Sequence, residues 1–209
     1  MKFKKESIGY VVIFTFIVCV AFVILLSIAN QLTLDRVKAN KSYESHFAVL
    51  SAFGLADGNT PKDQVESIYA ASIKELAAAD PGVSAYSADI DGTNYLAVKL
   101  TNPGLWGPIT GILAADIKAE RIRGFAILDQ QETPGLGGRI SEPWFIAQFK
   151  NEKVAGDGTI AVIQGSGKGD PDSENGQVDA ITGASRTSDF VKTLVNKSLD
   201  QIRKIGGSL

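Results

Sequence analysis

The chain has 209 residues and a formal net charge of −2, with a single Cys, Cys19, and a single His, His46. This length suffices for one sizeable domain, and the lack of a basic excess argues against nucleic acid as a partner. One Cys excludes a disulfide within the chain, and one Cys with one His excludes a Cys/His zinc site. We expect Cys19 to be an inert buried thiol and His46 to be solvated.

An uncharged apolar stretch runs from Ile8 to Ala29. As a helix it would be about 33 Å long, which is enough to cross the hydrocarbon core of a bilayer. A cleaved signal peptide is the alternative, because Ser27-Ile28-Ala29 resembles a cleavage site, but the apolar region of such a peptide is usually shorter. Three basic residues flank the stretch on each side, but Lys2, Lys4 and Lys5 are closer to it than Arg36, Lys38 and Lys41, which favours a cytoplasmic N-terminus. We therefore expect a retained single-pass anchor, with the rest of the chain outside the cytoplasm.

Hydrophobic periodicity and turn residues predict the elements that follow. We expect helices over residues 31–53, as a stalk that extends the apolar helix, and then over 61–79, 143–149 and 185–205. We expect strands over 84–90, 95–101, 111–116, 122–129 and 160–164, with a hairpin turn at 91–94, a glycine-rich loop at 131–139 and a polar loop at 165–177. Strands grouped between helices predict an α+β fold, in which a mostly antiparallel sheet is flanked by helices.

The most informative segment is residues 179–188, DAITGASRTS, at the start of the last predicted helix. A helix N-terminus offers unpaired backbone N–H groups and a partial positive charge, so it suits a phosphate group. A hydroxyl in this turn could carry that phosphate through an ester bond. On composition alone, an ordinary helix start with a Ser or Thr cap is the alternative.

Residues 182–187, TGASRT, resemble the flavinylation motif of the FMN-binding domain family. In that family a flavin transferase esterifies the last Thr of such a hexapeptide with the phosphate of FMN, which implies covalent FMN on Thr187. The resemblance also implies that Thr182, Gly183, Ala184 and Ser185 belong to the cofactor site, although Ser185 stands where the family more often has Thr. Asp179 matches the acidic residue that opens the transferase's recognition motif.

A second segment, residues 132–138, contains three glycines and a proline, which let the backbone approach a flat ligand closely. A plain β-turn loop is the alternative. The segment resembles the ETPGLG loop of the same family, which packs against the isoalloxazine ring. This resemblance implies cofactor-binding roles for Glu132, Thr133, Leu136 and Gly137.

Residues 105–109, LWGPI, and the predicted stalk resemble segments of the C subunits of sodium-translocating NADH:quinone reductases. Trp106 would then wall a ring pocket, with core packing at a strand entry as the alternative. Together, these expectations divide the chain into a cytoplasmic tip and transmembrane anchor (1–30), a helical stalk with a second helix (31–82) and an FMN-binding domain (83–209).

The implied function is electron transfer within a complex of several subunits in the bacterial inner membrane, with the flavin domain on the extracytoplasmic side. The implied partners are other membrane subunits, iron–sulfur and flavin carriers, and a flavin transferase for maturation. No nicotinamide fingerprint follows a strand, so the chain should not oxidise NADH alone, and no residue is expected to be catalytic or to bind a metal. The G subunit of an Rnf-type ferredoxin:NAD oxidoreductase, a membrane-tethered flavin sensor or assembly module, and an extracytoplasmic domain without cofactor remain alternatives.

Overall fold

The computed structural model describes residues 7–77 and 80–208 of the chain. Two compact units are present, Met1–Ser42 and Tyr43–Leu209. Helix α1 (Ile8–Phe53) contributes residues to both units, so the apolar stretch and the predicted stalk form one helix.

The first unit consists of the N-terminal part of α1, where apolar residues follow one another without a charged residue as far as Ala29. This helix is long and apolar enough to cross a membrane, judged by its length and composition. Cys19 is exposed on it, so the expectation of a buried thiol is wrong. The reason is that this part of the helix has no protein core against which to bury its side chains.

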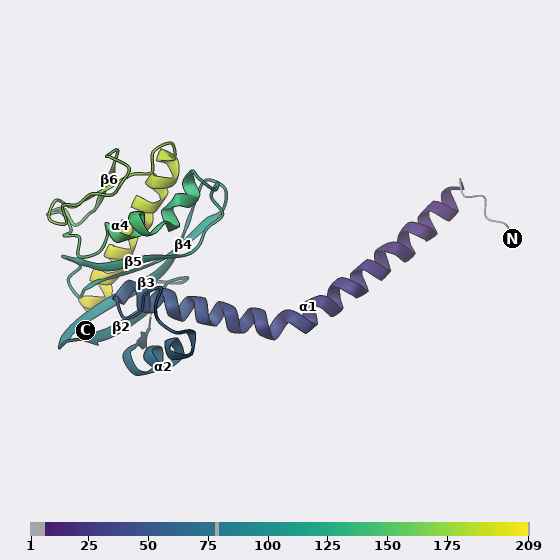
Figure 1. The fold of residues 1–209 in the computed structure, drawn as a ribbon, viewed down its shortest axis with the longest axis horizontal. Coiled ribbons are helices and arrows are strands. Elements are labelled where there is room, and N and C mark those ends of the chain that lie inside the picture. Colours follow the sequence, from purple (N-terminus) through teal and green to yellow (C-terminus); the bar gives the residue numbers. More distant parts are fainter. Residues whose placement is uncertain (1–6, 78–79, 209) are drawn as a thin grey trace. The chain divides into compact units, whose positions relative to one another are not determined.

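The second unit is built on a five-stranded antiparallel sheet whose strands follow one another in chain order (Figure 1). Its strands are β1 (Lys74–Leu76), β2 (Ser84–Ile90), β3 (Thr93–Pro103), β4 (Pro108–Asp116) and β5 (Ile122–Asp129). The predicted hairpin joins β2 to β3 through Asp91 and Gly92, with φ of 54° and 77°. Asp-Gly is a favoured pair in such tight turns because both positions need positive φ. The α+β prediction is confirmed.

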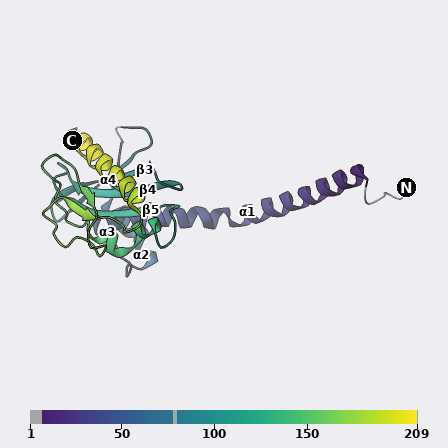
Figure 2. The ribbon, with the colours of Figure 1, turned by 90° about the horizontal axis from the view of Figure 1, so that it is seen from above.

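Alternation along the strands divides the core between the two faces of the sheet. Leu96 and Leu113 face the main core, which includes residues of α3 (Pro143–Ala147) and α4 (Ser185–Gly206). Ala97 and Ile112, their neighbours in sequence, belong to a second cluster with the end of α1. Figure 2 shows α4 lying across the strands. The start of α4 is therefore fixed against a rigid sheet.

The end of α1 packs so closely on the sheet that residue 124 has to be glycine. A Cβ on Gly124 would lie 2.6 Å from the carbonyl oxygen of Ala52. Beside this contact, Arg123 donates from Nε to the carbonyl oxygen of Phe53 at 3.1 Å. These contacts fix the last turn of α1 to β5.

Two local predictions differ from the structure. Helix α2 spans Lys62–Ser72 and ends before the predicted limit, because residues 74–76 pair as β1 with the edge of β2. The end of the predicted helix, residues 78–79, lies outside the described residues. The predicted strand at 160–164 is β6 (Ala161–Ile163), but its parallel partner β7 (Gln177–Asp179) was predicted to be part of a loop or turn.

His46 is also placed differently from the expectation of a solvated side chain. Its Nδ1 lies 2.9 Å from a carboxylate oxygen of Glu66, and its ring stacks on Tyr69 with a centroid distance of 3.9 Å. The ring therefore joins the end of α1 to α2. The sequence could not reveal this contact, because the partners belong to a different helix.

Candidate functional site

Helix α4 begins without a side-chain cap. Its N-cap position is Ala184, and no side chain bonds to the first N–H groups within the part of the chain that the structure describes. The Ser188 hydroxyl instead holds the preceding turn, accepting from the N–H of Ile181 at 3.0 Å and donating to the carbonyl of Ala184 at 3.1 Å. The backbone N–H groups of the first helical turn are therefore suitable donors for an anion.

Thr187 lies in this first turn with only 1% of its surface exposed. Its hydroxyl donates to Oε2 of Glu132 at 2.6 Å. Gly137 completes the contact, because a Cβ at that position would lie 2.6 Å from the Thr187 hydroxyl and 2.8 Å from Oε2 of Glu132. The structure thus brings together two sequence motifs that are far apart along the chain.

Glu132 joins a third segment to the same point. Its Oε1 accepts from the backbone N–H of Leu105 at 2.7 Å and from that of Trp106 at 3.2 Å. A Cβ on Gly104 would lie 2.7 Å from this oxygen, so the turn after β3 approaches the carboxylate as closely as glycine permits. The buried carboxylate is fully engaged in polar contacts, and its three bonds fix the turn at 104–107 against α4.

A cavity of about 460 Å³ opens beside these groups. Leu105, Trp106 and Leu136 expose large apolar surfaces around it, with Trp106 70% exposed. The cavity is lined by Leu105, Trp106, Glu132, Thr133, Leu136, Gly137, Gly183, Ala184, Ser185, Arg186 and Thr187. An apolar wall suits a flat aromatic ring, and the helix start suits a phosphate, so the lining residues fit a flavin nucleotide.

Most of the residues predicted from sequence line this one cavity. Thr182 does not line it, and neither does Asp179. The sequence prediction omitted two lining residues, Leu105 and Arg186. Both could have been predicted from their positions in the sequence. Leu105 adjoins Trp106, and Arg186 lies in the first turn of α4, where its cation can face a phosphate.

Asp179 lies at the end of β7 and is 6% exposed. Its carboxylate oxygen Oδ2 accepts from the Ser166 hydroxyl at 2.9 Å and from the N–H of Gly167 at 3.1 Å. Gln148 fixes the backbone of Asp179, donating to its carbonyl at 3.0 Å and accepting from its N–H at 2.8 Å. Asp179 therefore holds the loop at 165–168 against the strand.

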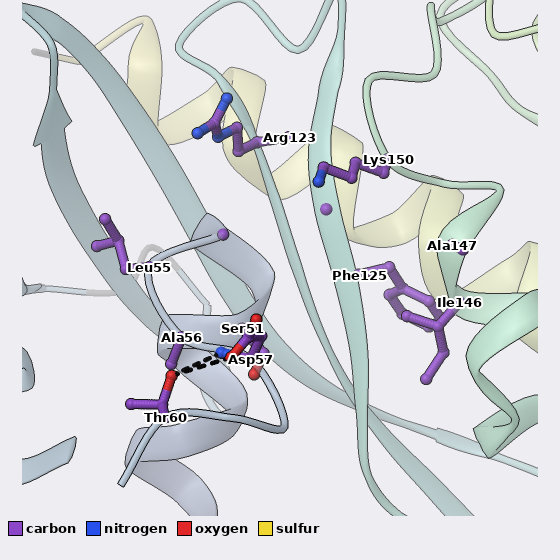
Figure 3. A pocket seen from close by; sticks show the side chains of 12 residues that line it. Ser51, Leu55, Ala56, Asp57, Thr60, Arg123, Phe125, Ile146, Ala147 and Lys150 are labelled. Atoms are coloured by element: carbon purple, nitrogen blue, oxygen red, sulfur yellow. Dashed lines mark hydrogen bonds between the residues drawn. The ribbon is translucent and has the colours of Figure 1, made fainter. Parts of the chain in front are cut away.

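A second cavity, of about 470 Å³, is lined by the end of α1 and the loop after it, by β5, and by the end of α3 with Lys150. Figure 3 shows the residues that line it. Arg123 and Lys150 give it a basic side, and Asp57 lies opposite, accepting from the Thr60 hydroxyl at 3.3 Å. None of the residues predicted as cofactor contacts lines this cavity. It is therefore separate from the candidate flavin site.

Glu152 is a buried carboxylate outside both cavities. It is 1% exposed, and its Oε1 accepts from the N–H of Gly176 at 2.9 Å. Burial raises the pKa of this carboxyl from 4.5 to about 7, because the charged form loses its hydration. Nearby Asp170 and Asp172 raise the pKa further, while the backbone bonds from Gly176 and Gln177 oppose the shift.

Comparison with known proteins identifies the segment that carries the first cavity. Residues 104–200 match the family model described as FMN-binding domain. The matched segment is similar to the FMN-binding domain family over just under half of the chain. The turn at 104–107, Glu132 and Thr187 all lie inside it, so the whole contact around the Thr187 hydroxyl falls within the segment that matches this family.

Two curated relatives of the chain carry the same description, the C subunit of the Na(+)-translocating NADH-quinone reductase. The relative from Pasteurella multocida is 26% identical, over 90% of this chain and 88% of that protein. The relative from Neisseria meningitidis serogroup A is 41% identical over 43% of this chain, which corresponds to 34% of the relative.

Two solved structures share the fold of this chain over most of its length. The C subunit of the Na(+)-translocating NADH-quinone reductase from Parabacteroides distasonis has a TM-score of 0.67 at 27% identity, covering 82% of this chain and 96% of that chain. The Shewanella oneidensis NqrC also has a TM-score of 0.67, at 20% identity, and covers 82% of this chain and all of that one.

Proposed function

We propose that this chain is a membrane-anchored electron-transfer subunit of a sodium-translocating NADH:quinone reductase and that it carries FMN covalently on Thr187. The observation that supports this most strongly is the position of the Thr187 hydroxyl. It lines an apolar cavity inside an FMN-binding domain, at the start of a helix whose first N–H groups have no side-chain cap.

A phosphoester on Thr187 would place a negatively charged phosphodiester near the first turn of α4. The helix N-terminus would stabilise that phosphate by about 0.3–2 kcal/mol. Arg186, in the same turn, would add a cation next to it. Covalent attachment would also prevent loss of the cofactor to a compartment that has no FMN pool.

When bound, FMN would supply the exchange of electrons, and the protein would supply its position and surroundings. Leu105, Trp106 and Leu136 would face the ring and exclude water from it. Thr133 and Gly137 would set its orientation from the loop at 132–137, and Gly183, Ala184 and Ser185 would line the phosphate end, with Thr182 beside them. The chain would not oxidise NADH by itself.

Helix α1 would anchor the chain in the bacterial inner membrane, with the FMN-binding domain on the extracytoplasmic side. The description shared by the curated relatives supports assembly with other membrane subunits. Iron–sulfur and flavin carriers among them would exchange electrons with this chain. A flavin transferase would mature it, with Asp179 as part of the segment that the enzyme recognises.

The attachment is tested by expressing the full chain with a flavin transferase, denaturing it in SDS and viewing the gel under ultraviolet light. We expect a fluorescent band from the wild type and from Ser185→Ala, and a dark band from Thr187→Ala. Ser185 is the matched control, because its hydroxyl lies in the same turn and lines the same cavity. Dark bands from wild type and variants alike would refute the proposed attachment.

A further inference from the structure

The two residues that a flavin transferase must reach are both covered in the folded domain. Thr187 is 1% exposed and Asp179 is 6% exposed. Different loops cover them, residues 132–137 over Thr187 and residues 165–168 over Asp179. We infer that the transferase acts on a locally opened form of the domain in which both loops have moved away, an inference that rests on the proposed attachment of FMN to Thr187.

In the folded domain the Thr187 hydroxyl is engaged by the loop at 132–137 and is not free to attack a phosphate. An attacking oxygen has to come within about 3–3.5 Å of the phosphorus atom. Gly137 and Oε2 of Glu132 already lie against the Thr187 oxygen, and the hydroxyl proton is donated to Glu132 at 2.6 Å. The Thr187 oxygen therefore becomes available for the new P–O bond when this hydrogen bond is released and the loop at 132–137 moves away.

The loop at 165–168 packs just as closely on Asp179. A Cβ on Gly165 would lie 1.6 Å from Oδ1 of Asp179, so the loop backbone rests directly on the carboxylate. The other carboxylate oxygen is bonded to Ser166 and Gly167. A transferase group that is to bind this carboxylate must first displace those two bonds.

The loop at 132–137 can open without unfolding the core. The loop at 132–137 contains its own turn, in which the N–H groups of Leu136 and Gly138 donate to the carbonyl of Thr133 at 3.1 and 2.9 Å. It is held to α4 by the Glu132 carboxylate, and Leu136 faces outwards. A segment that is held by few apolar contacts needs less free energy to open than the whole domain needs to unfold. The rate of modification is then the rate of the open form multiplied by the fraction of molecules that are open.

The modification itself is a phosphoryl transfer without oxidation or reduction. The Thr187 oxygen forms a bond to the phosphorus of the FMN half of a flavin dinucleotide. The anhydride bond of that dinucleotide breaks and a nucleoside monophosphate leaves. The hydroxyl proton passes to a base of the transferase or to water, so the product can no longer donate from Thr187 to Glu132.

The test measures FMN incorporation into the full chain, kept in detergent micelles, with purified transferase and a flavin dinucleotide. The rate of FMN incorporation is measured by intact mass at several urea concentrations below the unfolding transition. A synthetic peptide of residues 176–190 is measured in parallel, so that any effect of urea on the transferase itself can be corrected for. We expect the peptide to react faster than the folded chain, and the ratio of chain rate to peptide rate to rise with urea. If the chain and the peptide react at about the same rate in the absence of urea, the inference is overturned.

Two variants separate local opening from general loss of stability. Glu132→Gln weakens the charge-assisted bonds that hold one loop, so we expect incorporation about tenfold faster without urea. Gly124→Ala strains the packing of α1 on the sheet and touches neither loop, so its rate should match the wild type. Equal acceleration by both variants, or none by Glu132→Gln, would contradict local opening. Absence of FMN from both peptide and chain would instead refute the attachment at Thr187.

Discussion

The buried Glu152 carboxyl should make the stability of the FMN-binding domain depend on pH. Its pKa is raised in the folded state, so the folded chain binds the proton more tightly than the unfolded chain does. The contribution to stability is therefore fully present below the unfolded pKa of 4.5. It is lost as the pH rises through the folded pKa of about 7.

The size of this effect follows from the displacement of the pKa. A shift from 4.5 to about 7 corresponds to about 3 kcal/mol between the two limits. Glu152→Gln cannot ionise but retains a carbonyl oxygen that can accept from Gly176. We expect the wild type to lose on the order of 3 kcal/mol more stability than this variant between pH 4.5 and pH 8.

The assay is urea denaturation of the full chain in a mild detergent at a series of pH values, followed by tryptophan fluorescence. For each protein we compare the free energy of unfolding between two pH values. The contributions of groups that titrate in both proteins are then equal and drop out of the difference. Glu142→Gln is the control, because that carboxylate is exposed and its pKa is lowered, chiefly by the hydrogen bond from Trp144. Parallel pH curves for the wild type and Glu152→Gln would refute the reasoning.

Two further substitutions test the packing of α1 and the wall of the cavity. Gly124→Ala should lower the free energy of unfolding by about 1–3 kcal/mol, because the new methyl would meet the carbonyl of Ala52. Gly156→Ala has open space around it and should change urea denaturation far less, and equal losses would argue against the close packing. Trp106→Ala should change stability by less than about 0.5 kcal/mol but raise the fluorescence of attached FMN, because an indole stacked on the ring quenches it. Trp144→Phe, away from the cavity, is the control, and unchanged emission from Trp106→Ala would place the ring elsewhere.

The sequence predicted the elements whose pattern is local. Asp91-Gly92 between alternating strands indicated the first hairpin, and the apolar face of the last helix predicted α4. Strands β1 and β7 have three residues each, too few for an alternating pattern, and they exist because a partner strand lies beside them. Contacts of this kind cannot be inferred from periodicity.

The candidate site also has a part that the sequence predicts and a part that it does not. Resemblance to family motifs predicted nearly all of the lining residues, including Thr187 and Glu132. It did not predict that the Glu132 carboxylate bonds to Thr187 and to the backbone of Leu105 and Trp106. That arrangement depends on three segments that meet only after the sheet has formed. The burial of Asp179 beneath residues 165–168 depends likewise on the pairing of β6 with β7.

The most direct measurement is the mass of the tryptic peptides on either side of Arg186, taken from the full chain matured with its transferase. The account predicts that FMN, less one water, is attached to Thr187 in the peptide that begins there, or in the longer peptide if cleavage at Arg186 is blocked. Fragmentation should leave Ser185 and Ser188 unmodified. An unmodified Thr187, or FMN located on another residue, would contradict the account.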